Sequence, residues 1–217
     1  MPSGYAAGTA SLLHCVSTYL RSGLGVTPPY GAIVLAGGRA RRLAGRSKPE
    51  LRLGGRRLLD LVLDAVPDAD PRIVVGPEMD LPPNLQRVRE EPAGGGPVAG
   101  LAAGLAVLGQ DVEMVAVLAA DLPFLTRPVI SALSERVADG AVLVDDSGRD
   151  QLLIGVWRVG ALRLAVAALP GVDGASLRAL VARLDVARVS WDVPAGTPPP
   201  WWDCDSAEDL RQAKEWL

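Results

Sequence analysis

Short apolar runs rich in branched side chains alternate along the chain with segments of helical periodicity. Residues 32–36, 72–76 and 112–120 each have the pattern of a strand that is covered on both faces. Each of the two intervals between these runs contains a helical pattern, at residues 58–66 and 98–108. Because strand, helix and strand in succession form βαβ units, the pattern predicts an α/β domain with a mostly parallel sheet.

The first of these strands runs directly into Gly37 and Gly38, and a strongly basic segment follows. Five basic side chains precede the first carboxylate, that of Glu50: Arg39, Arg41, Arg42, Arg46 and Lys48. Glycines allow close backbone approach at the carboxyl end of a strand, and cations neutralise phosphate charge, so the segment suits a nucleoside triphosphate. It contains neither a Walker loop nor the G-x-G-x-x-G of a dinucleotide fold. A solvated arginine run after a tight turn is the structural alternative.

Composition and charge narrow the classes of partner. The chain has 217 residues, 49% hydrophobic and 22% charged, which is typical of a globular domain and excludes disordered and fibrous proteins. The apolar run at residues 114–120 is far shorter than the roughly 20 residues of a membrane span. A net charge of −3 provides no general attraction to nucleic acid or anionic lipid. We therefore expect no nucleic-acid partner and no membrane.

The scarcity of histidine and cysteine excludes several reactions. His14 is the only histidine, which excludes serine-histidine and cysteine-histidine catalysis and the common zinc sites. Cys15 and Cys204 are the only cysteines and lack metal-ligand spacing. Two distant thiols fit a reduced, cytoplasmic location.

Four segments together carry a resemblance to a known family. They are Leu35-Ala36-Gly37-Gly38 followed by Arg42, Gly45 and Lys48, then residues 95–101 (GGPVAGL), 121–123 (DLP) and 203–210 (DCDSAEDL). In order and spacing they resemble the molybdenum cofactor guanylyltransferases and the MobA-like nucleotidyltransferases around them, over residues 31–217. This resemblance implies a single Rossmann-like three-layer α/β/α domain, glycosyltransferase-A-like, that binds a nucleoside triphosphate above its first strand and helix.

The resemblance also assigns roles to the first motif. It implies that the backbone amides of Ala36, Gly37 and Gly38 contact the phosphates. The side chains of Arg42 and Lys48 would stabilise the departing pyrophosphate.

Asp121 follows the strongest strand pattern and has two interpretations. An aspartate after a strand commonly caps the next helix. In the family this position binds Mg²⁺, and a carboxylate is the hard oxygen ligand that magnesium prefers. Related enzymes take a second ligand from the turn that contains Asp203 and Asp205, so either aspartate is a candidate, and Asp205 is the one we assign. The start of the final helix, Asp205-Ser206-Ala207-Glu208, resembles a capping box, and one of the two aspartates is expected to cap it.

The glycine-rich loop before the helix at 98–108 is expected to lie over the nucleobase. The resemblance implies that Glu90 or Glu91 reads the exocyclic amine of guanine, although a flexible connection is the structural alternative. The remaining residues that the resemblance assigns to nucleotide binding are Leu35, Gly96, Pro97 and Gly100. The segment 151–158 resembles the strand that lines the acceptor pocket, but the proline that usually follows its first polar residue is absent.

Two further features are expected to be structural. Residues 173–180 read as a capped surface helix. Trp191, Trp201 and Trp202 lie in a proline-rich stretch and are expected to cover the edge of the core.

Residues 1–29 precede the domain and have no assigned role. They lack the basic start and small-residue cleavage site of a signal peptide. Since Pro28 and Pro29 separate this stretch from the first strand, we expect residues 1–29 to be a loosely ordered extension and residues 30–217 to form the nucleotidyltransferase domain.

The resemblance implies a cytoplasmic, Mg²⁺-dependent enzyme that transfers GMP from GTP to the terminal phosphate of molybdopterin or molybdenum-molybdopterin and releases pyrophosphate. Other proteins of molybdenum cofactor biosynthesis and apo-molybdoenzymes are its expected partners. A cytidylyltransferase acting on the same pterin, or a transferase for another small phosphate acceptor, would share the phosphate-binding residues. A nucleotide-binding module in cofactor delivery that has lost catalysis is the alternative from a different class.

Overall fold

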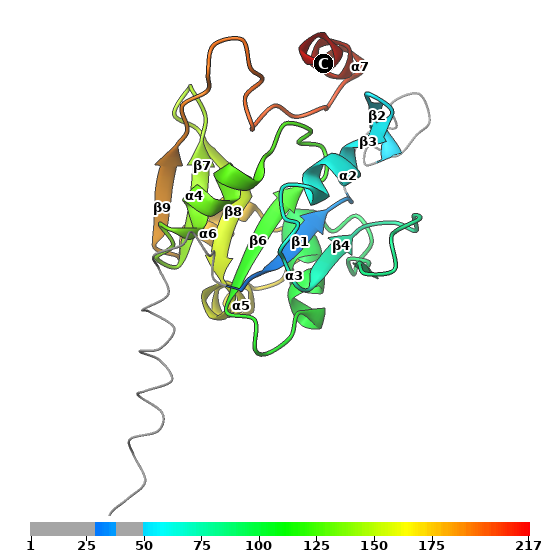
Figure 1. Cartoon of the computed structure of the whole chain (residues 1–217). Coiled ribbons are helices and arrows are strands. Elements are labelled where there is room, and N and C mark those ends of the chain that lie inside the picture. The colour runs from blue at the N-terminus through cyan, green and yellow to red at the C-terminus, as the bar shows by residue number, and fades with distance from the viewer. Residues whose placement is uncertain (1–28, 38–49) are drawn as a thin grey trace, which may run out of the picture.

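The computed structural model describes residues 29–37 and 50–217 (Figure 1). The extension predicted over residues 1–29 lies outside the described residues except for its last position. The predicted phosphate-binding residues Gly38, Arg42 and Lys48 also lie outside them.

A seven-stranded sheet forms the centre of the fold, with strand order β5-β4-β1-β6-β8-β7-β9. Its strands are β1 (Gly31–Leu35), β4 (Arg72–Val75), β5 (Gln86–Val88), β6 (Met114–Ala119), β7 (Gly140–Val144), β8 (Asp150–Arg158) and β9 (Val186–Ser190). Only β8 runs antiparallel to its neighbours β6 and β7; the other pairings in the sheet are parallel. The predicted mostly parallel α/β sheet is confirmed. A short hairpin, β2 (Arg52–Leu53) and β3 (Arg56–Arg57), stands apart from the sheet.

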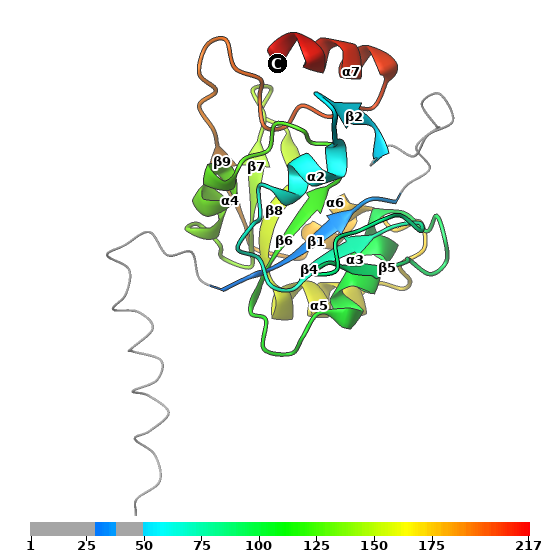
Figure 2. The same ribbon diagram turned by 45° about the vertical axis from the view of Figure 1, so that its right-hand side comes forward.

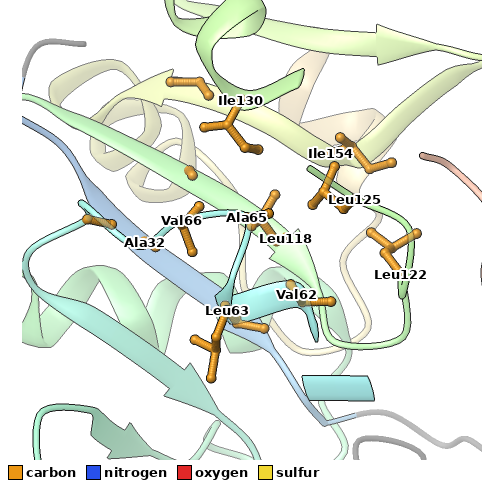
Figure 3. Packing of buried hydrophobic residues seen from close by; sticks show 14 of the residues in the cluster. Ala32, Val62, Leu63, Ala65, Val66, Leu118, Leu122, Leu125, Ile130 and Ile154 are labelled. Atoms are coloured by element: carbon orange, nitrogen blue, oxygen red, sulfur yellow. The ribbon is translucent and has the colours of Figure 1, made fainter. Parts of the chain in front are cut away.

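Helices cover both faces of the sheet and complete three layers (Figures 1 and 2). Helices α2 (Leu58–Leu63) and α4 (Arg127–Ser134) contribute to one core, and α3 (Pro97–Val107), α5 (Val159–Ala167) and α6 (Leu177–Val181) contribute to the other. Side chains alternate across a strand, so Ala32 and Val34 enter the first core while Ile33 and Leu35 enter the second. Figure 3 shows the first core, where Val62 of α2 and Ile130 of α4 pack on the face that includes Leu118 of β6.

Parallel register brings the carboxyl ends of the central strands to one edge. Leu35 at the end of β1 is level with Val75 at the end of β4 and with Ala119 at the end of β6. The order in which strands are added to the sheet reverses at β1, since β4 lies on one side of β1 and β6 lies on the other. Such an edge is where open α/β sheets bind ligands.

A third, smaller core joins the segment at residues 51–58 to the carboxyl-terminal part of the chain. Helix α7 (Ala207–Ala213), which continues into the 3₁₀ helix η2 (Lys214–Trp216), lies beside the β2–β3 hairpin (Figure 2). Ala213 of α7 and the side chain of Cys204 pack there with Leu53 of β2 and with Trp202. Trp191 and Trp201 pack against the first core, so the prediction that these three tryptophans cover the edge of the core is confirmed.

The capping prediction for the last helix was wrong about the residues. Ser206, not Asp203 or Asp205, is the N-cap of α7, and it forms a capping box with Asp209 rather than with Glu208. The helix begins one residue later than the sequence pattern suggested, which moves the third helical position to Asp209. Ser176 caps α6 as expected for the segment 173–180.

The longest helix in residues 29–37 and 50–217 is α3, with 11 residues. None of the helices in these two ranges has the length and apolar character needed to cross a bilayer.

Candidate functional site

A pocket of ≈ 240 Å³ opens at the carboxyl edge of β1, β4 and β6. It is lined by Leu35, Gly37, Val75, Glu90, Gly96, Pro97, Gly100, Ala119, Asp121 and Leu153. Seven of these ten residues are ones that the sequence assigned to the nucleotide or the metal: Leu35, Gly37, Glu90, Gly96, Pro97, Gly100 and Asp121. Residues far apart in the sequence therefore meet because the strand ends are in register.

The carboxylate of Glu90 lies against the backbone of Gly37. A β-carbon built on Gly37 would stand 3.2 Å from Oε1 and 3.3 Å from Oε2 of Glu90. Oε1 also accepts a hydrogen bond of 3.1 Å from the amide of Gly94, which fixes the side chain on the loop that follows it. Glu91 is exposed and does not line the pocket, so the structure brings only Glu90 of the two glutamates to the site.

The glycine-rich loop ends at the pocket in a tightly packed turn. Gly96 has φ +90°, a conformation that side chains rarely adopt, and it precedes Pro97 at the first position of α3. Gly95 is buried beneath the neighbouring loop, where its carbonyl accepts a 2.8 Å hydrogen bond from the amide of Gly174. The amino terminus of α3, at Gly96 and Pro97, borders the pocket with the positive end of the helix dipole.

Asp121 lies between the end of β6 and the turn into α4. The N-cap of α4 is Thr126, so Asp121 does not cap that helix. The carbonyl of Asp121 accepts a 3.1 Å hydrogen bond from the amide of Cys204, which places the turn containing Asp203 and Asp205 beside it. The described residues contain no group of three or more His, Cys, Asp or Glu side chains poised to hold a metal together.

One expected phosphate contact is contradicted by the structure. The amide of Ala36 donates a 2.7 Å hydrogen bond to the carbonyl of Val75, as the sheet continues one residue beyond β1. It is not available to a phosphate, and the expected amide contacts fall to Gly37 and Gly38. The roles of Arg42 and Lys48 remain predictions because both residues lie outside the described ranges.

Three apolar lining residues were not identified from the sequence as parts of the site. Val75 and Ala119 end β4 and β6, and Leu153 lies near the start of β8. Each of these residues lies at or near the end of a strand, and the sequence could have indicated that. Only the order of strands in the sheet shows that these strand ends are neighbours. Leu153 does lie in the segment that resembles the acceptor-side strand.

The model of the MobA-like NTP transferase domain family matches residues 32–213. The chain belongs to this family. Membership places it among the nucleotidyltransferases, which agrees with a pocket formed at the carboxyl ends of β1, β4 and β6.

Relatives in this family carry a more specific name. The molybdenum cofactor guanylyltransferase of Nitrobacter hamburgensis is 31% identical over 202 residues, covering 86% of this chain and 94% of that protein. The enzyme of the same name from Rhodopseudomonas palustris is 32% identical over 207 residues, covering 86% and 91%.

Solved structures share the fold at lower sequence identity. Molybdopterin-guanine dinucleotide biosynthesis protein A from Archaeoglobus fulgidus has a TM-score of 0.62 at 20% identity, with 85% of this chain and 97% of that chain covered. The 4-diphosphocytidyl-2C-methyl-D-erythritol synthase of Anaerococcus prevotii has a TM-score of 0.64 at 15% identity, with 88% and 99% covered. The same fold therefore occurs in proteins named for different nucleotide-containing products.

Proposed function

We propose that this protein transfers GMP from GTP to the terminal phosphate of molybdopterin or of its molybdenum-bearing form. The observation that carries the proposal is the pocket that brings Glu90, Gly37 and Asp121 together at the carboxyl edge of the sheet. The names of the relatives supply the substrates, and the two carboxylates that line the pocket, those of Glu90 and Asp121, support the proposal.

Glu90 is the proposed reader of the guanine base. Guanine presents an exocyclic amine and a ring N–H, and a carboxylate that accepts from both binds it with charge-assisted hydrogen bonds. The amide of Gly94 holds Glu90 in place, so little side-chain freedom would be lost on binding. Gly96 and Pro97 border the same pocket and would lie against the base or ribose.

The residues present fit a magnesium ion. Mg²⁺ takes oxygen ligands and is usually held by one or two carboxylates together with substrate phosphates. Asp121 lines the pocket, and the hydrogen bond from the amide of Cys204 brings Asp203 and Asp205 into its neighbourhood. Asp121 and Asp205 are the proposed ligands; when bound, the ion would neutralise charge on the phosphates.

The chemistry needs no covalent intermediate and no histidine. An oxygen of the acceptor's terminal phosphate bonds to the α-phosphorus of GTP, and the bond from that phosphorus to the bridging oxygen of the β-phosphate breaks, releasing pyrophosphate. A phosphate monoester is already anionic near neutral pH and does not require a base. The protein orients the two substrates in line, while the amide of Gly37 and the side chains of Arg42 and Lys48 are expected to stabilise the triphosphate and its leaving group.

The test is pyrophosphate release with GTP, CTP, ATP and UTP in turn, each with molybdopterin as the acceptor and Mg²⁺ present. Activity with GTP supports the proposal, whereas preference for CTP would make the protein a cytidylyltransferase. Nucleotide binding without turnover of any of the four would indicate a module that has lost catalysis.

The variant Asp121→Asn and its control Glu113→Gln test the proposed role of Asp121. Asp121→Asn is expected to lower turnover about a hundredfold or more and to weaken the dependence of the rate on Mg²⁺ concentration. Glu113→Gln replaces a carboxylate at the opposite end of β6 and should leave both unchanged. Near-normal turnover of Asp121→Asn would remove Asp121 from the mechanism.

A further inference from the structure

The glycine-rich loop, residues 90–96, is held in place by a second loop of the chain. This second loop, residues 168–176, connects α5 to α6, and we call it the α5–α6 loop. The amide of Gly174 donates a 2.8 Å hydrogen bond to the carbonyl of Gly95. Oδ1 of Asp173 lies 3.3 Å from where a β-carbon on Gly95 would stand. No residue of the α5–α6 loop is among the ten that line the pocket at the carboxyl edge of β1, β4 and β6.

Hydrogen bonds fix the glycine-rich loop both from within and from outside. Within it, the amide of Gly94 donates to Oε1 of Glu90 at 3.1 Å, and the amide of Gly95 donates to the carbonyl of Pro92 at 2.9 Å. The bond from the amide of Gly174 comes from outside. Gly95 is buried, so loss of this donor would leave its carbonyl away from water without a partner, which is unfavourable. The place of Gly95 therefore depends on the α5–α6 loop.

The place of Gly95 matters to the pocket because residues on both sides of it line the pocket. Glu90 stands at the start of the glycine-rich loop, and Gly96 and Pro97 follow Gly95 directly. Gly96 is the N-cap of α3, which begins at Pro97. A shift of Gly95 would consequently move the carboxylate that is proposed to read guanine together with the start of α3.

The α5–α6 loop is anchored on the second core. Val172 and Ala175 pack against that core, and the fully buried Leu180 of α6 belongs to it. The hydroxyl of Ser176 accepts a 3.4 Å hydrogen bond from the amide of Ala179 and caps α6. The amide of Gly174 thus comes from a segment that is attached to the core both before and after it.

The backbone at Gly174 has a conformation that favours glycine. Its φ is +64°, in the left-handed region, which asparagine enters more readily than alanine and which β-branched residues rarely adopt. Space is not the constraint, because a β-carbon on Gly174 would meet nothing within 4 Å. A substitution here therefore changes the backbone preference of the α5–α6 loop without creating a clash.

We propose that the α5–α6 loop positions the residues that recognise guanine, with Gly174 as the positioning residue. The inference rests on the proposed GMP transfer and deepens it, since it extends the control of base recognition to a loop that does not line the pocket. Recognition of guanine by Glu90 then depends on the backbone conformation at Gly174. The loop acts on nucleotide affinity and base discrimination, whereas kcat at saturating GTP stays close to that of the unmodified protein.

The first experiment changes the backbone preference at Gly174. Isothermal titration, with Mg²⁺ present and no acceptor, measures the Kd of GTP and of inosine triphosphate, which lacks the exocyclic amine. The Kd of GTP should rise in the order Gly174→Asn, Gly174→Ala, Gly174→Val, from close to that of the unmodified protein to about tenfold or more above it. The preference for GTP over inosine triphosphate should shrink in the same order. Gly174→Asn and Gly174→Ala decide the comparison if Gly174→Val does not fold.

Gly196 provides the matched control. Its φ is +81° and a β-carbon there would meet nothing within 4 Å, but it lies in the segment between β9 and α7. The same three substitutions at Gly196 should lower the free energy of unfolding, measured by urea denaturation, as much as those at Gly174. Both nucleotide affinities should stay unchanged. Equal changes of affinity in the two series would overturn the assignment, as would an unchanged affinity throughout the series at Gly174.

Hydrogen exchange tests the same coupling without a substitution. Binding of GTP to the unmodified protein is expected to slow amide exchange in residues 168–176 and in the glycine-rich loop together, and to leave residues 194–197 unchanged. Slower exchange in the glycine-rich loop alone would overturn the inference while leaving GMP transfer intact. Absence of both GTP binding and transfer in the unmodified protein would instead refute the proposed function.

Discussion

The carboxylate of Glu90 faces the α-carbon of Gly37, with both of its oxygens within 3.3 Å of where a β-carbon would stand. This contact joins the end of β1 to the loop after β5 and sets one wall of the pocket. It predicts that Glu90→Gln lowers kcat/KM for GTP by about tenfold or more, since an amide offers guanine one acceptor where the carboxylate offers two. Steady-state kinetics with GTP and with inosine triphosphate, which lacks the exocyclic amine, measures the effect.

Glu91→Gln is the matched control for this substitution. Glu91 is the next residue but is exposed and outside the pocket, so kcat/KM for GTP should stay within about twofold of the unmodified protein. Discrimination between the two nucleotides should shrink only in the Glu90 variant. Equal losses in both variants would mean that neither side chain contacts the base specifically.

The packing of Gly95 predicts that the glycine-rich loop tolerates no side chain there. A β-carbon on Gly95 would lie 2.9 Å from both the carbonyl oxygen of Pro92 and the β-carbon of Ala99, and 3.3 Å from Oδ1 of Asp173. Gly95→Ala must therefore shift the loop that carries Gly96 and Pro97, and the KM for GTP should rise severalfold. Isothermal titration with GTP gives the same comparison without catalysis.

Gly171→Ala tests whether this effect is specific to the contact. Gly171 belongs to the loop that packs on Gly95, yet a β-carbon there would meet nothing within 4 Å. GTP affinity should be unaffected by this change. A similar loss in both variants would show that the two loops respond to any added side chain rather than to the clash at Gly95.

The indole of Trp157 predicts a large difference between two glycine substitutions. A β-carbon on Gly140 of β7 would lie 2.1 Å from Cε3 of Trp157, which is buried across the strand pair. Gly140→Ala should lower the free energy of unfolding by about 1–3 kcal/mol or more, because backbone or ring must move in a close-packed core. Urea denaturation is the measurement.

Gly160→Ala is expected to have the opposite sign. Gly160 lies in α5, and a β-carbon there would meet nothing within 4 Å, so alanine should stabilise the fold by about 0.5 kcal/mol through helix propensity. A loss of stability in Gly160→Ala, or none in Gly140→Ala, would contradict the packing described for β7 and α5.

The turn between β7 and β8 predicts acid sensitivity. The carboxylate of Asp145 accepts hydrogen bonds from the hydroxyl of Ser147, the amide of Arg149 and Nε2 of Gln151, at 2.7 Å, 2.9 Å and 2.7 Å. These donors lower the pKa of Asp145 from 3.8 to about 2, with the Ser147 hydroxyl as the largest cause. A lowered pKa in the folded state stabilises the fold above the unfolded pKa, and the stabilisation disappears as pH falls from about 4 to about 2.

Asp145→Asn should accordingly reduce the dependence of the unfolding midpoint on pH in that range, measured by urea denaturation at pH 5 and pH 2.5. Asp146→Asn, at the neighbouring exposed aspartate, should retain the dependence of the unmodified protein. An unchanged pH dependence in Asp145→Asn would show that the hydrogen bonds of this turn do not contribute to stability in solution.

Local pattern was sufficient to predict the central elements. The strands at β1, β4 and β6 and the helices at α2 and α3 were expected within a few residues of their observed bounds, because runs of branched apolar residues and stretches rich in alanine and leucine can be recognised over short lengths of sequence. The choice between Glu90 and Glu91 could not be made in this way. Both precede the same loop, and only the packing of Glu90 on Gly37 distinguishes them.

The family, the order of the motifs and the candidate chemistry were determined by the sequence, since they depend on residue identity and on spacing along the chain. Tertiary structure decided which of those residues meet. In the folded protein the amide of Ala36 donates a hydrogen bond within the sheet, Ser206 caps α7, and the proline-rich segment at residues 191–200 lies near Phe124. These outcomes depend on strand register and on contacts between residues far apart in the chain, which local sequence does not encode.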